Sequence, residues 1–160
     1  MTSLPEAFKT ALEMEQRGHD YYVGSATRLK DPVLASVMEA LASDEFQHLN
    51  LIRRYYEALE RTEHWPAPTA ETEAPASARA RIDEIMQSSV GATAPDDSYL
   101  EIYQHAHDLE LSARDYYRAL GEENDDPALV KFFHFLAAVE QTHLDMLGMV
   151  LSATREALES

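Results

Sequence analysis

The stretch Ser43-Asp44-Glu45-Phe46-Gln47-His48 decides how this chain folds, because its Glu-x-x-His pattern belongs to a signature that occurs twice. In the first copy Glu15 precedes Glu45 by 30 residues, and in the second copy Glu110 precedes Glu140 by the same interval. A histidine follows three residues after the second glutamate of each copy, at His48 and His143. The sequence therefore carries the same set of two carboxylates and one imidazole twice, 95 residues apart.

The duplication extends well beyond these six residues. When the chain is laid over itself with an offset of 95 residues and no gaps, positions 11–52 and 106–147 are identical at 13 of 42 places. The matches include Tyr21-Tyr22 and Asp31-Pro32, each with its counterpart. An internal duplication, or selection on two equivalent halves, is the simplest explanation.

Apolar residues recur at helical spacing in four long stretches, and no stretch keeps up the period of two that strands require. We therefore predict an all-α chain with helices over about 4–29, 31–61, 98–122 and 126–158. Each predicted start carries a capping signal. These signals are Ser3 with Glu6, Asp31-Pro32, Ser98 with Glu101, and Asp126-Pro127.

The chain is expected to form one domain, residues 1–160, because 160 residues with 45% hydrophobic content suit a single core. The helices pair into two hairpins, at about 4–62 and 98–158, joined by a long crossover at about 63–97 with one short helix near 78–86. A bundle whose second and third helices run parallel requires such a crossover. The crossover would also let two protomers exchange hairpins.

The composition excludes several classes of site and partner. The chain has 13 basic and 29 acidic residues and a formal charge of −16, which repels nucleic acid and anionic lipid. It has no cysteine, so disulfides, thiolate zinc sites and iron–sulfur clusters are excluded. The N-terminal residues show no signal-peptide pattern, and no uncharged apolar run reaches the ~20 residues of a membrane span. We expect a cytoplasmic protein without nucleic-acid or membrane partners.

The six residues of the signature are expected to meet inside the bundle. In an antiparallel hairpin, two residues lie at the same height when their midpoint falls at the turn. The midpoint of Glu15 and Glu45 is residue 30, and that of Glu110 and Glu140 is residue 125, so each pair is level across its own hairpin. The glutamates and histidines interrupt the apolar faces that should point into the core.

Four buried carboxylates require positive charge, and no Lys or Arg occupies these apolar faces near the glutamates. The cations must therefore come from outside the chain. Glu-x-x-His places a carboxylate and an imidazole on successive turns of one helix face, where both can reach a metal. Oxygen and imidazole ligands favour two iron or manganese ions over a lone structural zinc.

With these residues the chain resembles the rubrerythrin-type members of the ferritin-like superfamily, which hold two iron ions in a four-helix bundle. The resemblance rests on Ala11-x-x-x-Glu15 with Tyr22, residues 43–48, Ala106-x-x-x-Glu110 with Tyr117, and Glu140-Gln141-Thr142-His143. It implies a ferritin-like bundle of two helical hairpins. It also implies terminal ligands at Glu15 and Glu110, bridging ligands at Glu45 and Glu140, and one histidine, His48 or His143, for each metal.

Two features depart from that family. Rubrerythrins usually carry a further carboxylate one turn after the third-helix glutamate, where this chain has Ala113. They also usually carry a cysteine-ligated rubredoxin domain, and this sequence contains no cysteine. The resemblance therefore implies the metal site more firmly than it implies peroxide reduction, and any electron donor would be a separate protein.

Three residues beside the signature have two interpretations each. Tyr22 and Tyr117 lie two turns from Glu15 and Glu110, so their hydroxyls can bond to ligand carboxylates or be oxidised in a catalytic role. Alternatively they are core aromatics with satisfied hydroxyls. Asp44, one turn before His48, either orients a ligand or lies exposed on the surface.

The favoured hypothesis is a di-iron oxidoreductase, either a peroxidase or a ferroxidase, that cycles two iron ions between Fe²⁺ and Fe³⁺ with H₂O₂ or O₂. Manganese or zinc could occupy the same ligands. One alternative is a metal-binding or iron-storage module without catalytic turnover. Another is a structural helical dimer around a non-redox metal. We also expect the protein to form a homodimer.

Overall fold

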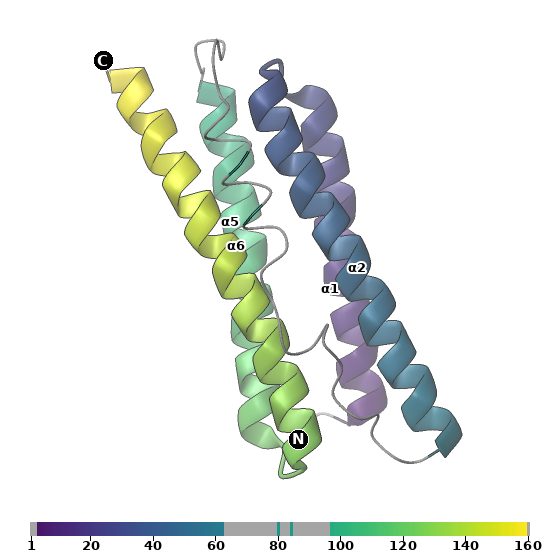
Figure 1. Ribbon diagram of the computed structural model, residues 1–160. Helices are drawn as coiled ribbons and strands as arrows, with labels where there is room; N and C mark the ends of the chain where they lie inside the picture. The colour runs from purple at the N-terminus through teal and green to yellow at the C-terminus, as the bar shows by residue number, and fades with distance from the viewer. Residues whose placement is uncertain (1–2, 63–79, 81–83, 85–96, 160) are drawn as a thin grey trace.

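The computed structural model describes residues 3–62, 80, 84 and 97–159, and within them the regular structure is helical. The long helices are α1 (Leu4–Arg28), α2 (Pro32–Thr62), α5 (Asp97–Glu123) and α6 (Pro127–Glu159) (Figure 1). The predicted all-α four-helix architecture is confirmed, with each helix boundary within about two residues of its predicted position. Most of the predicted crossover at 63–97, including its short helix near 78–86, lies outside the described residues.

The helices form two hairpins that lie side by side. Helix α1 packs along α2, α5 packs along α6, and α1 also contacts α5. Following the chain in Figure 1, α2 and α5 run in the same direction, as expected for a bundle with a long crossover between them. Each hairpin turn is only a few residues long. Helix α1 ends at Arg28 and α2 starts at Pro32, and α5 ends at Glu123 and α6 starts at Pro127.

Side-chain caps explain where three of the helices begin. The Ser3 hydroxyl accepts a hydrogen bond from the Glu6 amide at 3.3 Å. Asp31 and Asp126 each accept one from the backbone amide two residues later, at 2.9 Å. The remaining predicted cap, Ser98 at the start of α5, is wrong. Helix α5 is already helical at Asp97, so Ser98 lies inside it.

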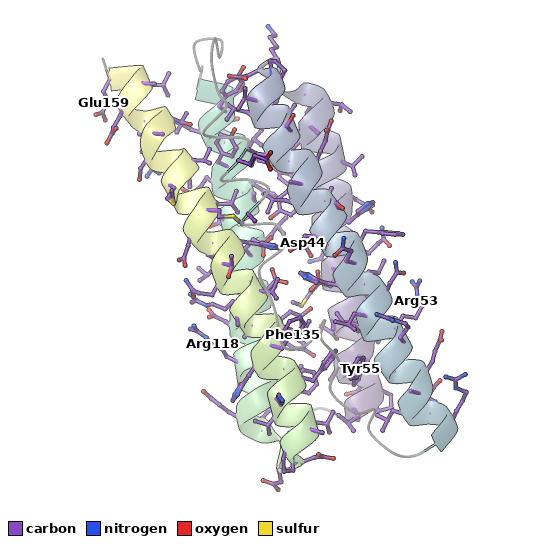
Figure 2. The ribbon with its side chains drawn as sticks, in the orientation of Figure 1. Asp44, Arg53, Tyr55, Arg118, Phe135 and Glu159 are labelled. Carbon is purple, nitrogen blue, oxygen red and sulfur yellow. The ribbon has the colours of Figure 1, made fainter. Side chains whose placement is uncertain are left out.

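Among the described residues, the core consists of two apolar clusters. The first contains residues from the α1–α2 turn, the start of α5 and the end of α6, among them Tyr22, Met38, Leu41, Tyr103 and Leu147. The second contains residues from the other end of the bundle, among them Phe8, Ile52, Tyr55, Phe133 and Phe135 (Figure 2). Burial of these side chains is the main stabilising contribution to the fold. The chain segments between the two clusters carry the six signature residues.

The outer faces of the helices are charged, so the described helices are amphipathic rather than apolar all round. None of the helices among the described residues has the combination of length and apolar composition that a membrane span requires. The bundle instead directs its apolar faces inward, toward the two core clusters.

Candidate metal centre

The six signature residues converge in the middle of the bundle from all four long helices. Every one of them is at most 7% exposed. Helix α1 contributes one glutamate, α5 contributes one, and α2 and α6 each contribute a glutamate and a histidine. In that order they are Glu15, Glu110, Glu45 with His48, and Glu140 with His143. The level arrangement predicted from the hairpin midpoints is therefore what the structure shows.

The potential ligand atoms fall into two interlocking groups. One group consists of Glu15, Glu45, His48 and Glu140, and the other of Glu45, Glu110, Glu140 and His143. Within each group the ligand atoms lie within 4.8 Å of one another. Glu45 and Glu140 belong to both groups. This arrangement suits two metal ions that share two carboxylates, with one further glutamate and one histidine for each ion.

Both imidazoles turn the same ring nitrogen toward the carboxylates. His143 Nδ1 lies 3.2 Å from Glu110 Oε1, 3.4 Å from Glu45 Oε1 and 3.5 Å from Glu140 Oε2. His48 Nδ1 lies 3.8 Å from Glu15 Oε2. The two rings are stacked with their centroids 5.9 Å apart. Each hairpin therefore presents one Nδ1 atom to the centre of the cluster.

The two tyrosines reach across the bundle. Tyr117 of α5 donates a hydrogen bond to Glu15 Oε1 of α1 at 2.7 Å. Tyr22 of α1 donates a short hydrogen bond to Glu110 Oε1 of α5. Both hydroxyls are thus bonded to signature carboxylates, as one of the two interpretations predicted, but each bond goes to the other hairpin. The role of these tyrosines as oxidisable groups stays a prediction.

Comparison with protein families identifies the family to which this sequence belongs. The sequence matches the model of the Rubrerythrin family over residues 6–148, which include all six signature residues. The chain belongs to the rubrerythrin family. A search of curated proteins found no match, and neither did a search of solved structures. The predicted resemblance to rubrerythrins, and through them to the ferritin-like superfamily, is confirmed.

Several polar atoms of this rubrerythrin-family site are buried without a hydrogen-bond partner. They are Glu15 Oε2, Glu110 Oε2, both carboxylate oxygens of Glu140, and His48 Nδ1. A buried polar group without a partner destabilises the fold by about 1–3 kcal/mol, and more when the group is charged. Hard or borderline cations such as iron and manganese bind to this set of carboxylate oxygens and imidazole nitrogens. The residues present therefore fit the pair of metal ions that the family implies.

The carboxylates divide into two pairs by their proton affinity. Burial raises the pKa of Glu45 and of Glu140 well above the ordinary value, and the charges of the neighbouring glutamates raise both further. Burial also acts on Glu110, but the charge of His143 and the hydrogen bonds to this carboxylate bring its pKa down to about 2. The pKa of Glu15 is lowered as well, because hydrogen bonds and the charge of His48 outweigh its burial. In the metal-free cluster the two shared glutamates therefore bind a proton more readily than Glu15 and Glu110 do.

The same charges act on the tyrosines and on one histidine of the cluster. Burial and the negative charge of Glu110 raise the pKa of Tyr22 well above its ordinary value, and burial and Glu15 do the same for Tyr117. Burial lowers the pKa of His143, but the charge of Glu110 and the bond to Asp44 outweigh it, so the net shift is upward. Both tyrosines therefore remain protonated hydrogen-bond donors at neutral pH.

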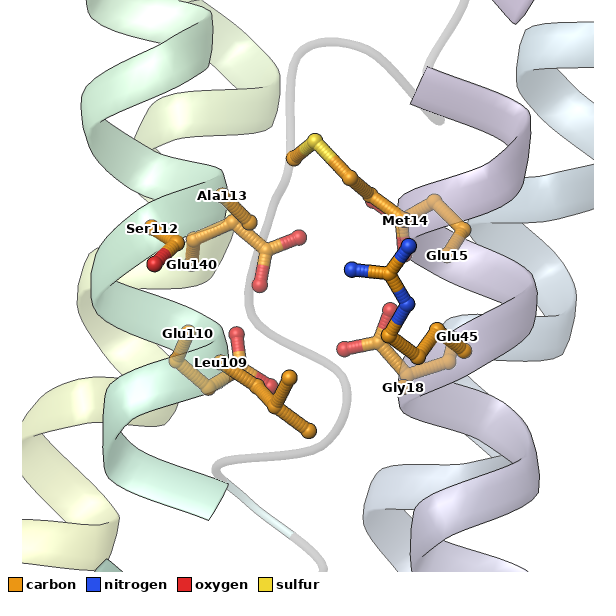
Figure 3. A pocket seen from close by; sticks show the side chains of 10 residues that line it. Met14, Glu15, Gly18, Glu45, Leu109, Glu110, Ser112, Ala113 and Glu140 are labelled. Carbon is orange, nitrogen blue, oxygen red and sulfur yellow. The ribbon is translucent and has the colours of Figure 1, made fainter. Parts of the chain in front are cut away.

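A small pocket leads to the cluster between α1 and α5. Its volume is about 90 Å³, and Glu15, Glu45, Glu110 and Glu140 form part of its wall (Figure 3). The small residues Gly18 and Ala113, one turn after the glutamates of α1 and α5, also line it. Space for a small molecule thus exists at Ala113, the position where rubrerythrins usually carry a further carboxylate.

The sequence left the position of one polar residue undecided. Asp44 is 6% exposed, so the interpretation of this side chain as a surface group is wrong. It lies near the middle of α2 on the side that faces α6 (Figure 2). Its Oδ2 atom is 2.7 Å from His143 Nε2 and 3.6 Å from His48 Nε2. The spacing of Asp44 and His48, one turn apart on α2, was the only sequence signal for this arrangement.

Proposed function

We propose that the six signature residues bind two iron ions and that the protein reacts with H₂O₂ or O₂ as a peroxidase or ferroxidase. Glu15 with His48 would hold one ion and Glu110 with His143 the other, and Glu45 and Glu140 would be available to both. The observation that supports this assignment is the presence of two ligand groups that share these two glutamates. Membership of the rubrerythrin family supports iron as the metal.

Two bound Fe²⁺ ions would supply the two electrons that, with two protons, reduce H₂O₂ to two water molecules. The chain itself contributes a buried cluster and a fixed geometry. Its apolar clusters on either side keep bulk water away from the carboxylates. The hydrogen bonds that Tyr22 and Tyr117 donate across the bundle hold Glu110 and Glu15 in place. These two carboxylates would then keep their positions when the charge of the bound metal changes. The pocket between α1 and α5 is the proposed route for the oxidant.

Peroxidase and ferroxidase activities share the oxidation step and differ in the fate of the ferric ions. In a peroxidase these ions stay in place and are reduced again by an electron donor outside this sequence, which has no cysteine for an iron–sulfur or rubredoxin centre. In a ferroxidase the ferric ions leave. Ala113 supplies no carboxylate that could replace a ligand during the redox cycle.

Anaerobic loading with Fe²⁺ followed by rapid mixing with H₂O₂ or O₂ tests the proposal. We expect two iron ions per chain and rapid oxidation by one of the two oxidants. If the protein is a peroxidase, we also expect repeated turnover when a reductant is added. Oxidation followed by release of Fe³⁺ or growth of a mineral core would identify iron handling instead. Two bound ions without any oxidation would indicate a structural metal site and contradict the proposal.

Glu45→Ala provides the matching variant, because it removes a carboxylate common to both ligand groups. We expect the variant to lose binding of both ions. Glu39→Ala on the exposed face of the same helix is the control and should bind iron like the wild type. If Glu45→Ala folds and keeps two ions per chain, the bridging role of Glu45 is refuted.

A further inference from the structure

One oxygen atom of Asp44 lies near both imidazoles of the cluster but is hydrogen-bonded to only one of them. Its Oδ2 lies 2.7 Å from Nε2 of His143, a hydrogen-bonding distance, and 3.6 Å from Nε2 of His48, which is beyond one. Both contacts are to the ring nitrogen that points away from the glutamates. The carboxylate therefore sits behind the histidines, outside the two ligand groups.

The duplication of the chain does not extend to this residue. In the alignment of the two halves, position 44 corresponds to position 139, which is a valine. Val139 is 2% exposed and packs in the second core cluster, so it offers no polar atom to either histidine. The two halves supply matching ligands, but only the first half supplies a carboxylate behind them.

A carboxylate that accepts the Nε2 proton of a histidine fixes the orientation of the ring and leaves the Nδ1 lone pair free to bind a metal. Asp44 meets this condition for His143, whose Nδ1 faces three of the glutamates. It does not meet it for His48 at the observed separation. Asp44 therefore orients the ring of His143 by a hydrogen bond, whereas the ring of His48 has no such bond to Asp44.

We propose that Asp44 is a positioning residue for His143, and that it makes the two metal positions unequal, with the ion at Glu110 and His143 bound more tightly. This inference rests on the proposed two-metal site and adds to it an order of filling. It also assigns a physical consequence to a buried position beside the ligands at which the duplicated halves differ in polarity.

Titration of the metal-free protein with Zn²⁺ at pH 8 tests the order of filling without any redox step. Zn²⁺ is diamagnetic, so ¹⁵N NMR of the histidine rings reports which imidazole binds each added ion. We expect the His143 signals to change during the first equivalent and the His48 signals during the second. Simultaneous changes, or His48 first, would overturn the inference although two ions are bound. Binding of fewer than two ions would instead refute the two-metal site.

Two variants separate a positioning role from a structural one. Asp44→Val copies the residue of the other half, and we expect it to lower the affinity for the first ion by about 10- to 100-fold and to abolish the order of filling. Asp44→Asn keeps an acceptor oxygen and should retain most of the affinity for the first ion and most of the order of filling. Asp20→Asn, at an aspartate with a 67% exposed side chain on α1, is the control. Wild-type affinity and order in Asp44→Val would overturn the inference.

A measurement on the wild type keeps the test independent of whether the valine variant folds. In the zinc-loaded protein, the Nε2 proton of His143 should exchange with solvent more slowly than that of His48, because only the former is held by Asp44. Equal exchange rates of the two protons would overturn the inference.

Discussion

Replacing Glu140 by glutamine should make the metal-free protein more stable. Glu140 is 1% exposed, and neither of its carboxylate oxygens has a hydrogen-bond partner. Burial, followed by the charges of Glu110 and Glu15, raises its pKa well above the ordinary value of 4.5. Glutamine keeps the shape of the side chain and cannot ionise. Its amide can also donate hydrogen bonds to the carboxylates that remain.

The size of the gain follows from the penalty for one buried, unpaired polar group, about 1–3 kcal/mol. For a chain of this length each kcal/mol moves the melting temperature by about 2–4 °C, so we expect a rise of roughly 2–12 °C at neutral pH. The gain should depend on pH in a definite direction. A group with a raised folded-state pKa keeps its proton at low pH and destabilises the fold as pH rises from 4.5 through that pKa. The difference between Glu140→Gln and wild type should therefore be small at pH 4 and larger at pH 8.

Thermal unfolding followed by circular dichroism, with chelator present, measures this difference at several pH values. Glu39→Gln removes an exposed carboxylate of α2 and should shift the melting temperature by less than about 1 °C at any of them. A metal-free Glu140→Gln protein that is less stable than wild type at pH 8 would refute the reasoning. That result would mean that the protein itself already compensates the charge of Glu140.

Bound metal should make the wild type more stable than the Glu140→Gln variant. At a free metal concentration 100 times the dissociation constant, wild type gains about 2.7 kcal/mol for one ion, whereas the variant lacks a shared ligand and should gain much less. The same melting experiment with Zn²⁺ in place of chelator measures both gains. An equal gain in the two proteins would show that Glu140 is no metal ligand.

Three further substitutions probe the contacts around the site and at the helix ends. Tyr117→Phe removes the 2.7 Å hydrogen bond to Glu15 and should destabilise the protein by about 1.5–3 kcal/mol in urea unfolding. The control Tyr116→Phe, at the neighbouring residue, should change the stability little. Equal effects of the two substitutions would show that the hydrogen bond does not stabilise the fold. Ser3→Ala removes the cap of α1 and should cost about 1 kcal/mol in the same assay, so unchanged unfolding would contradict the capping assignment. Phe8→Ala, at a fully buried ring in the second core cluster, should cost about 3–5 kcal/mol, and a loss below about 1 kcal/mol would show that the start of α1 is loosely packed.

Sequence alone predicted the residues of the candidate site because their spacing along the helices is regular. A helix repeats its face every three to four residues, so Glu45 and His48 must share a face of α2. A short antiparallel turn fixes which residues of its two helices lie level, which placed Glu15 beside Glu45 and Glu110 beside Glu140. The Asp-Pro pairs that start α2 and α6 fixed the turns and hence these heights.

Errors and gaps in the prediction occurred where local patterns are ambiguous. Ser98 with Glu101 has the spacing of a capping box, but α5 is already helical one residue earlier. Asp44 could equally have pointed to solvent, because a residue at the edge of a helix face is assigned to core or surface only by its neighbours. Its burial depends on His143, which lies 99 residues away.

Contacts between the hairpins were decided by the tertiary structure. Tyr22 bonds to Glu110 and Tyr117 to Glu15 because α1 and α5 pack against each other, and periodicity within one helix does not specify the partner on another. The same packing leaves the pocket at Gly18 and Ala113 and brings one oxygen of Asp44 between two histidines. Sequence determined which of the six signature side chains enter the core and at what height, since those depend on helix geometry. The tertiary structure decided which of them touch, because that depends on how two separately formed hairpins pack together.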